Sequence, residues 1–352
     1  MKLEELLTTE SRRTYHSSAL FFILSVTPLR GLCRRYLERH VGKVTPGTHT
    51  EINYLRVRAL VEINDCKFQA AAKYAAQAVA LARTYKDDLG LLHSLLQLQL
   101  AVAGLDDYEQ MLQVSREMEQ LAALANHPRD LALAYLGQGG ARMSQGAYAE
   151  AVLLVDRARA YLPHELGPVP EAVVLGLAAS GALHLGHCER AVELAATALS
   201  TVQRARWTLL QLRYPLTCIL EVYLALDRPE RYRAQIEAAL DRLQKIARQF
   251  AMAVPASAMY QGIYWWKWGH PRRALAAFRK SLAAAGRLKL QQDLATTQYW
   301  VGCFAQSPQG RSPMPEGSAP YLLAALATDE RLGAAGMVAS IRGALQNSSR
   351  GA

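Results

Sequence analysis

The sequence lacks the marks of several large protein classes. Its 352 residues include 5 Cys, an odd number without a C-x-x-C pair. This argues against a disulfide framework or a zinc ribbon and favours reduced cysteines that serve as small core residues. There is no glycine-rich phosphate loop, no G-x-S-x-G elbow and no H-E-x-x-H motif. The sequence therefore predicts a protein without catalytic residues and without a cofactor.

Long apolar runs are also missing. The longest, ALFFILSV over residues 19–26, is far below the roughly 20 residues that cross a bilayer. Glu4, Glu5 and Glu10 precede it, and no small-residue cleavage site follows, so it does not read as a signal peptide. We expect a buried amphipathic helix here, no membrane contact and a cytoplasmic location.

Charge is present but unevenly distributed. The net charge is +10, and residues 101–200 hold 6 Lys and Arg against 12 Asp and Glu, whereas residues 201–300 hold 16 against 6. The basic region could bind the phosphates of a nucleic acid. Alternatively, the acidic part of one copy could meet the basic part of another in self-assembly. The plainer interpretation is a solvated outer face of amphipathic helices.

A pattern of residues recurs with a nearly constant period. Residues 137–163, GQGGARMSQGAYAEAVLLVDRARAYLP, contain in order a small residue, a turn glycine, an aromatic residue, an alanine, a large apolar residue, an alanine and a proline. The alanine that opens the second helix recurs, in two copies as another residue, at Ala71, Met111, Ala151, Ala191, Tyr232 and Ala274. These positions are 40, 40, 40, 41 and 42 residues apart, which predicts a repeat protein.

The residue types explain what each repeat does. Small side chains let two antiparallel helices approach to about 8 Å, and each pair leaves an apolar face that the next pair covers. We therefore predict an all-α fold, a right-handed superhelix (α-solenoid) of antiparallel helix pairs that forms one domain over residues 1–352. Six repeats occupy residues 49–289, with N-terminal capping helices over 1–48 and C-terminal capping helices over 290–352. A loop over residues 306–317 divides the C-terminal cap.

These features resemble the tetratricopeptide-repeat superfamily over most of the chain. The long period is similar to that of the repeats in the C-terminal arms of bacterial signal-transducing ATPases, both maltose-regulator-like and cyclase-linked. The stretches RRALAAFRKSLAAAGRLKLQQDLATTQYWVG and APYLLAALATDERLGAAGMVASIRGAL are similar to the ends of those arms. The resemblance implies a bacterial sensor or protein-interaction arm. It implies no ATPase or transcription-factor activity, because the corresponding modules are absent from the sequence.

In that superfamily the first helix of each pair lines a concave groove and the second faces outward. The resemblance places these residues in the groove: Asn53, Arg56, Asn64, His93, Met143, His184, Tyr214, Glu221, Met259, Trp266 and Lys267. Amide, cationic and aromatic groups together suit an extended peptide. We expect an interaction scaffold or regulatory arm that binds a peptide segment or partner domain. A nucleic-acid-binding regulator and a self-assembling structural protein are the alternatives.

Two stretches invite a more specific interpretation. LHLGHCER, residues 183–190, supplies two His and one Cys across a predicted turn, which is short of a zinc site, so no metal is predicted. YWWKWGHPRRALAAFRKSL, residues 264–282, looks like an aromatic and basic platform. The repeat register instead assigns Trp265 and Phe278 to packing positions and leaves only Trp266 and Lys267 facing the groove.

Overall fold

The computed structural model describes residues 30–40, 48–161, 167–205, 209–312 and 314–350, and these contain helices and connecting turns but no β-strand. The first eight helices are α2 (Arg30–His40), α3 (His49–Asn64), α4 (Phe68–Thr84), α5 (Asp88–Gly104), α6 (Tyr108–Leu124), α7 (Pro128–Gln145), α8 (Tyr148–Arg159) and α9 (Pro168–His184). The next are α10 (Cys188–Arg204), α11 (Arg213–Ala225), α12 (Arg233–Gln249), α13 (Val254–Lys267), α14 (Pro271–Leu288), α15 (Gln291–Gln306), α16 (Pro308–Arg311), α17 (Ala319–Leu332) and α18 (Ala335–Arg350).

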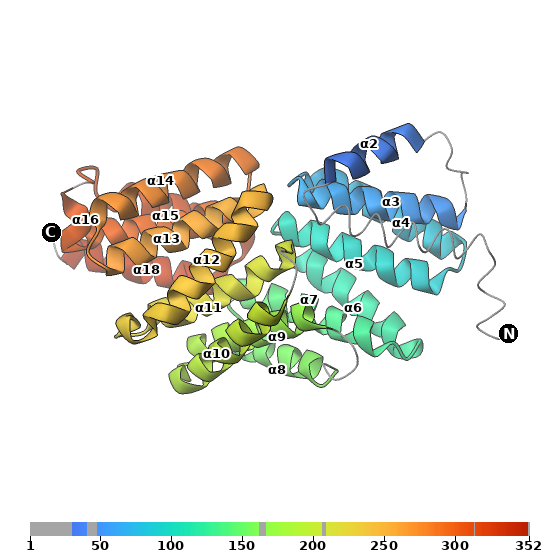
Figure 1. Cartoon of the computed structure of the whole chain (residues 1–352), viewed down its shortest axis with the longest axis horizontal. Coiled ribbons are helices and arrows are strands. Elements are labelled where there is room, and N and C mark those ends of the chain that lie inside the picture. Colours follow the sequence, from blue (N-terminus) through green and yellow to red (C-terminus); the bar gives the residue numbers. More distant parts are fainter. Residues whose placement is uncertain (1–29, 41–47, 162–166, 206–208, 313, 351–352) are drawn as a thin grey trace.

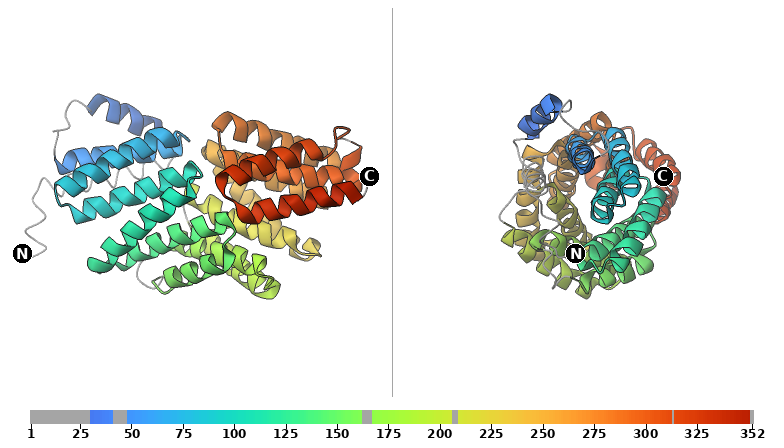
Figure 2. Two further views of the ribbon diagram at one scale, coloured as in Figure 1. Left: turned by 180° about the vertical axis from the view of Figure 1, so that it is seen from behind. Right: turned by 90° about the vertical axis from the view of Figure 1, so that its right-hand side faces the viewer.

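Consecutive helices form the predicted pairs, from α3 with α4 to α13 with α14, and the pairs stack side by side. The stack curls into a right-handed superhelix of tetratricopeptide-like pairs, so that the helices form a ring when viewed along its axis (Figure 2). The all-α prediction is thus confirmed.

Small residues occupy the closest contacts between paired helices. Ala71, Ala151, Ala191 and Ala274 are each 0% exposed. In the last pair, a β-carbon on Gly262 would come within 2.6 Å of the Phe278 ring. A larger residue at any of these positions would force the two helices apart, so the repeat pattern follows directly from the packing.

The turns inside the pairs keep one backbone geometry. Cys66, Asp106, Gly146 and Gly186 follow one another at intervals of 40 residues, and all have positive φ, at 59°, 59°, 81° and 81°. Glycine adopts this conformation most easily, yet Cys66 and Asp106 adopt it as well. The geometry of the turn is therefore preserved where the residue type is not.

The fifth pair departs from this regularity. Three short 3-10 helices lie in this region of the described chain. Leu210–Leu212 lies before α11, Pro229–Tyr232 before α12 and Ala251–Ala253 before α13. These extra segments accompany the increase in spacing from 40 to 41 and 42 residues.

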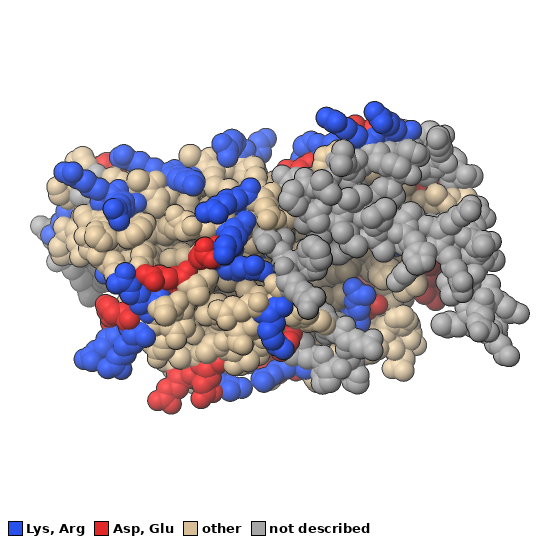
Figure 3. All heavy atoms as spheres, viewed as in Figure 1, with Lys and Arg blue, Asp and Glu red and all other residues tan. Residues whose placement is uncertain are grey.

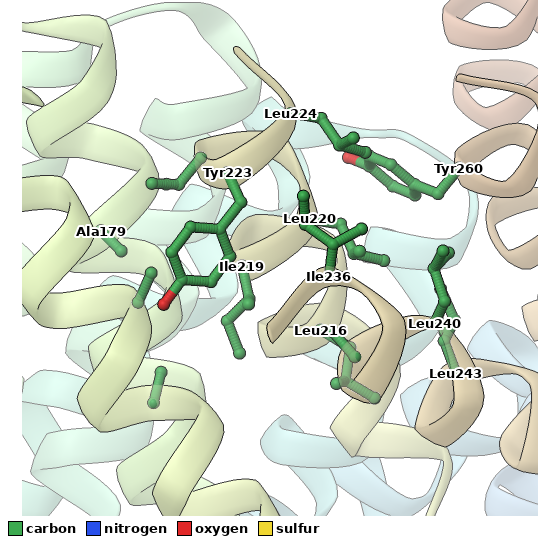
Figure 4. Packing of buried hydrophobic residues seen from close by; sticks show 14 of the residues in the cluster. Ala179, Leu216, Ile219, Leu220, Tyr223, Leu224, Ile236, Leu240, Leu243 and Tyr260 are labelled. Carbon is green, nitrogen blue, oxygen red and sulfur yellow. The ribbon is translucent and has the colours of Figure 1, made fainter. Parts of the chain in front are cut away.

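The largest core cluster lies where α9, α11, α12 and α13 meet (Figure 4). Tyr223 is 1% exposed and stacks on Tyr232 with ring centroids 5.0 Å apart. Leu216, Ile219 and Leu220 are fully buried around it. Tyr232 stands where other repeats carry the close-contact alanine, and an aromatic stack replaces the close helix approach there.

Two sequence-based expectations need correction. The proposed loop over residues 306–317 contains a short helix, α16, before the chain enters α17, which packs on α15. Cys188 is exposed and so is not a core residue, because it opens α10 on the solvent side of the turn. The apolar run at residues 19–26 lies outside the described residues.

The two halves of the superhelix meet at a seam that joins repeats far apart in sequence (Figures 1 and 2). On the apolar side, Leu290 packs with Ile63, Phe68 and Ala101, and Leu332 packs against the cluster of Tyr108 and Leu112. These contacts link the turns of the first two repeats to the turns that flank α15 and α17.

Polar contacts complete the seam. The Tyr108 hydroxyl donates to Oε1 of Gln292 at 3.0 Å, and the backbone N–H of Gln292 donates to Oδ2 of Asp106 at 3.1 Å. Asp329 is 0% exposed, and the Gln292 side chain beside it offsets only part of the cost of burying its carboxylate. Gly146 lies so close to Gly336 that a β-carbon there would overlap its backbone. The superhelix is thus a closed structure.

At the N-terminal end, α2 covers α3 through Leu37 against Val57 and Val61. Arg34 forms ion pairs with Asp65 and, at 3.5 Å, with Glu62. No helix in the described part of the chain is both long and apolar enough to cross a membrane.

We predict that Asp329→Asn stabilises the protein at neutral pH. Burial raises the pKa of Asp329 to about 6, against an ordinary value of 3.8. A carboxyl group with a raised pKa favours folding below pH 4, and this contribution is lost as the pH rises through 6. The variant should therefore gain about 1–2 kcal/mol in the free energy of unfolding at pH 8 and nearly nothing at pH 4. Urea denaturation at the two pH values measures this.

Asp156→Asn is the matched control, because Asp156 is exposed on α8 and should change little at either pH. A loss of stability at pH 8 in the Asp329 variant would mean that the charged carboxylate has a favourable partner in the seam.

Candidate functional site

The first helices of the pairs carry the polar and aromatic side chains that the sequence assigns to a concave groove. Tyr214 on α11 illustrates this: 40% of the residue is exposed, yet burial among the surrounding helices raises its pKa well above the ordinary 10. Tyr214 therefore lies close to other parts of the protein and is still accessible to solvent. The candidate site is the surface formed by these first-helix residues, called the inner surface below.

One group of predicted residues lies near the N-terminal end of the surface. Nη1 of Arg56 donates to Oδ1 of Asn53 at 2.8 Å on α3. His93 on α5 lies close enough that the Arg56 charge adds to burial in lowering the His93 pKa to about 3. Burial also lowers the pKa of Arg56 to about 10. This end therefore presents an amide, a guanidinium and a neutral imidazole.

A second group lies on α9 and α11. Glu221 accepts a hydrogen bond from the Ser180 hydroxyl at 2.6 Å and contacts Nε2 of His184 at 3.0 Å. The His184 ring stacks on Tyr148 from α8, with centroids 4.1 Å apart and planes 2° from parallel. No Lys or Arg forms an ion pair with Glu221 in the described chain. Its negative charge is therefore not neutralised by a permanent cation.

Aromatic and thiol groups surround this carboxylate. Tyr214 and Cys218 share its face of α11 at spacings of seven and three residues. Burial is the main cause that raises the pKa of Tyr148, Tyr214, Cys218 and Tyr260, and the negative charge of Glu221 raises it further. All four therefore stay neutral at physiological pH, and the cluster can interact through its rings, its hydroxyl groups and one carboxylate.

The remaining predicted groove residues fall into two classes. Met143, Trp266 and Lys267 keep some exposure, although Trp266 packs edge-on against Phe304 with ring centroids 5.7 Å apart. Asn64 and Met259 are only 2% and 5% exposed. A partner in the groove would not reach them, because Asn64 ends α3 beside the seam and Met259 packs into the main core.

Sequence reasoning missed several members of the second group. Ser180 lies 41 residues before Glu221, at the same position of the preceding repeat, so the register could have found it. Tyr148 could not be found in this way, because it belongs to a second helix and its register position is one of packing. Cys218 and Tyr260 were not distinguished from core residues.

The LHLGHCER stretch divides between two environments. His184 belongs to the Glu221 cluster, whereas His187 and Cys188 are exposed at the turn into α10. No group of three or more His, Cys, Asp or Glu in the described residues is arranged to hold a metal ion.

The stretch over residues 264–282 is divided in the same way. Phe278 is 0% exposed, as its packing position requires. Trp268 stacks on Tyr264 with centroids 4.4 Å apart, and Trp265 stays half-buried beneath the guanidinium of Arg273, 4.9 Å from the ring centroid. The basic residues lie mainly on α14, away from the inner surface.

We predict that His93→Gln reduces the loss of stability on mild acidification. With its pKa lowered to about 3, the folded protein keeps His93 neutral while the unfolded chain takes up a proton below pH 6.5. The contribution of His93 is therefore complete above pH 6.5 and falls as the pH decreases. Between pH 7 and pH 5 the variant should lose up to about 2 kcal/mol less in unfolding free energy than the wild type.

His187→Gln, at an exposed imidazole, controls for the loss of a histidine and should follow the wild type. Equal pH dependence of His93→Gln and the wild type would mean that His93 is readily protonated in the folded state.

Comparison with known proteins shows the fold but not a family. No protein-family model and no curated protein sequence matches the chain. Among solved structures, a Rap protein complexed with Competence and Sporulation Factor superposes with a TM-score of 0.70 at 13% identity, covering 94% of this chain and 89% of that one. The apo form of RapI superposes with a TM-score of 0.59 at 12% identity, covering 80% of this chain and 99% of that one.

Both matches extend over most of each chain, so the likeness concerns the whole superhelix and not a single helix pair. At these identities it carries no residue roles. The chain shares the tetratricopeptide-like helical-repeat fold of these Rap structures.

Proposed function

We propose that this protein is a non-enzymatic interaction scaffold or regulatory arm that binds a peptide segment or partner domain on its inner surface. The observation that carries the proposal is the Glu221 cluster, in which a carboxylate without a permanent cationic partner in the described chain lies near the rings of Tyr148 and Tyr214. Support also comes from the neighbouring fold that was solved in complex with Competence and Sporulation Factor, since it can present a surface to another molecule.

The chemistry of the cluster favours a positively charged group on the ligand. A Lys or Arg side chain, or an N-terminal amine, would neutralise Glu221 and could lie against the rings of Tyr148 and Tyr214 through cation–π contacts. Because the carboxylate is already held by Ser180 and His184, it needs little reorganisation on binding. A ligand thus gains affinity from a preformed anchor.

The Asn53–Arg56 pair supplies the complementary chemistry at the other end of the surface. A side-chain amide can donate to and accept from a peptide backbone, and a guanidinium can bind a carbonyl or carboxylate. A peptide that spans both groups would place its cationic group at Glu221 and its carbonyl or acidic groups near α3. We also propose that the protein works like the arms of signal-transducing ATPases, which sense a partner.

We predict that random heptapeptides displayed against the full-length protein will yield binders enriched in Lys and Arg. Glu221→Gln should weaken the best binder about tenfold, or about 1.4 kcal/mol, because the variant keeps the shape of the side chain but removes its charge. Isothermal titration calorimetry of the synthetic peptide measures the affinity.

Glu189→Gln on the exposed face of α10 is the matched control and should leave the affinity within twofold. Failure to select any peptide that competes for one site, or equal effects of the two substitutions, would contradict binding at the inner surface.

A further inference from the structure

The exposed face of α14 carries cations and no acid. Five basic residues project from an 18-residue helix without Asp or Glu, and all of them are exposed: Arg272, Arg273, Arg279, Lys280 and Arg287. They form two rows along the helix, one of Arg272 and Arg279 and the other of Arg273, Lys280 and Arg287. Neighbours within a row are seven residues apart, which is about 10 Å along the helix. Between the rows lie only the small residues Ala276 and Ala283, so the charges form a continuous ridge.

This charge is not paired with a carboxylate, although the Arg273 guanidinium also lies over the Trp265 ring. None of the five cations forms an ion pair in the described residues. Cations elsewhere on the surface are commonly paired, as Arg83 is with Glu117 and Arg190 with Glu193. Lys and Arg side chains gather over α12 and α14 on the face shown in Figure 3. The ridge, defined by these five side chains of α14, thus presents uncompensated positive charge.

A furrow runs beside the ridge, over α12 and α13, and Lys280 of α14 borders its larger part. It consists of two adjoining hollows of about 400 and 260 Å³ that share Gln244 and Gln261. Arg248 and Lys280 are the charged residues of the larger hollow, and no carboxylate lines it. Its floor is made of small and apolar side chains.

The smaller hollow ends on aromatic rings. Tyr264 and Trp265 line it together with Glu237 and Asp241. Both carboxylates are engaged, because Glu237 binds Arg233 at 2.8 Å and the Tyr264 hydroxyl at 2.7 Å, and Asp241 binds Lys245 at 2.6 Å. Their charge is therefore largely compensated.

We propose that the α14 ridge and the adjoining furrow form a binding surface for single-stranded nucleic acid, separate from the inner surface and independent of its function. The phosphates lie along the ridge and at Arg248, and a base enters the furrow, where Gln244 and Gln261 offer amides and Trp265, with Arg273 over its ring, forms an aromatic wall. Cationic tracks beside aromatic rings are the usual means of binding single strands.

The furrow favours a single strand over the other polyanions. Bases of a duplex are stacked and paired inside the helix and cannot enter a recess of this size, so a duplex would contact only the ridge. An acidic protein segment could also use the ridge, but its Asp and Glu side chains have no flat ring for the furrow. The three ligands therefore differ in which parts of the surface they engage.

The test measures fluorescence anisotropy of labelled dT20 with the full-length protein at several salt concentrations. We expect binding at 50 mM salt, with a slope of log affinity against log salt of roughly −3, as for about four phosphate contacts. Arg279→Glu with Arg287→Glu should weaken binding at least tenfold. The double variant Lys73→Glu with Arg116→Glu makes the same charge change at exposed, unpaired cations on α4 and α6 and should stay within threefold of the wild type.

Three results would overturn the proposal. They are no binding of dT20 at 50 mM salt, equal loss in the two double variants, and displacement of dT20 by polyglutamate of equal charge as effectively as by unlabelled dT20. The last would assign the ridge to an acidic protein segment. A 20-base-pair duplex should bind more weakly than dT20, and equal affinity would remove the furrow from the site.

Discussion

The structure depends on how closely two antiparallel helices can approach. Alanine or glycine at the contact positions lets each pair pack tightly, and the same packing, repeated about every 40 residues, sets a nearly constant rotation from one pair to the next. A constant rotation produces a ring, and a ring produces an inner and an outer surface. The grouping of side chains around Glu221 and the exposed ridge of α14 both follow from this one constraint.

The same constraint explains how much the sequence could predict. The positions of Ala71, Ala151 and Ala191 gave the helix pairs correctly, because a small residue is needed wherever helices touch and the need recurs with the repeat. The seam could not be predicted, because Tyr108 and Gln292 are 184 residues apart and neither carries a local signal of contact. For the same reason, the sequence assigned Asn64 to the groove, although it lies beside the seam.

The candidate site was predictable in part. Helical periodicity and the family resemblance placed His184 and Glu221 on first helices, where they were expected to face inward. They gave no indication that Tyr148, from a second helix, would stack on His184, since this contact depends on how far each pair rotates. The aromatic stretch at residues 264–282 shows the opposite case: the register correctly buried Phe278, but it did not anticipate that Trp265 would border an open furrow.

The closed seam sets this protein apart from an open stack of repeats. In an open array each unit touches only its neighbours, so the terminal units fray first and stability is approximately a sum of local terms. Here Asp106 and Tyr108 of the second repeat are fastened to α15, so the two ends of the array protect each other. Loss of either end would break contacts at both ends, so the chain should unfold as one cooperative unit. Closure of the seam during folding should be slow, because it joins residues that are far apart in the sequence.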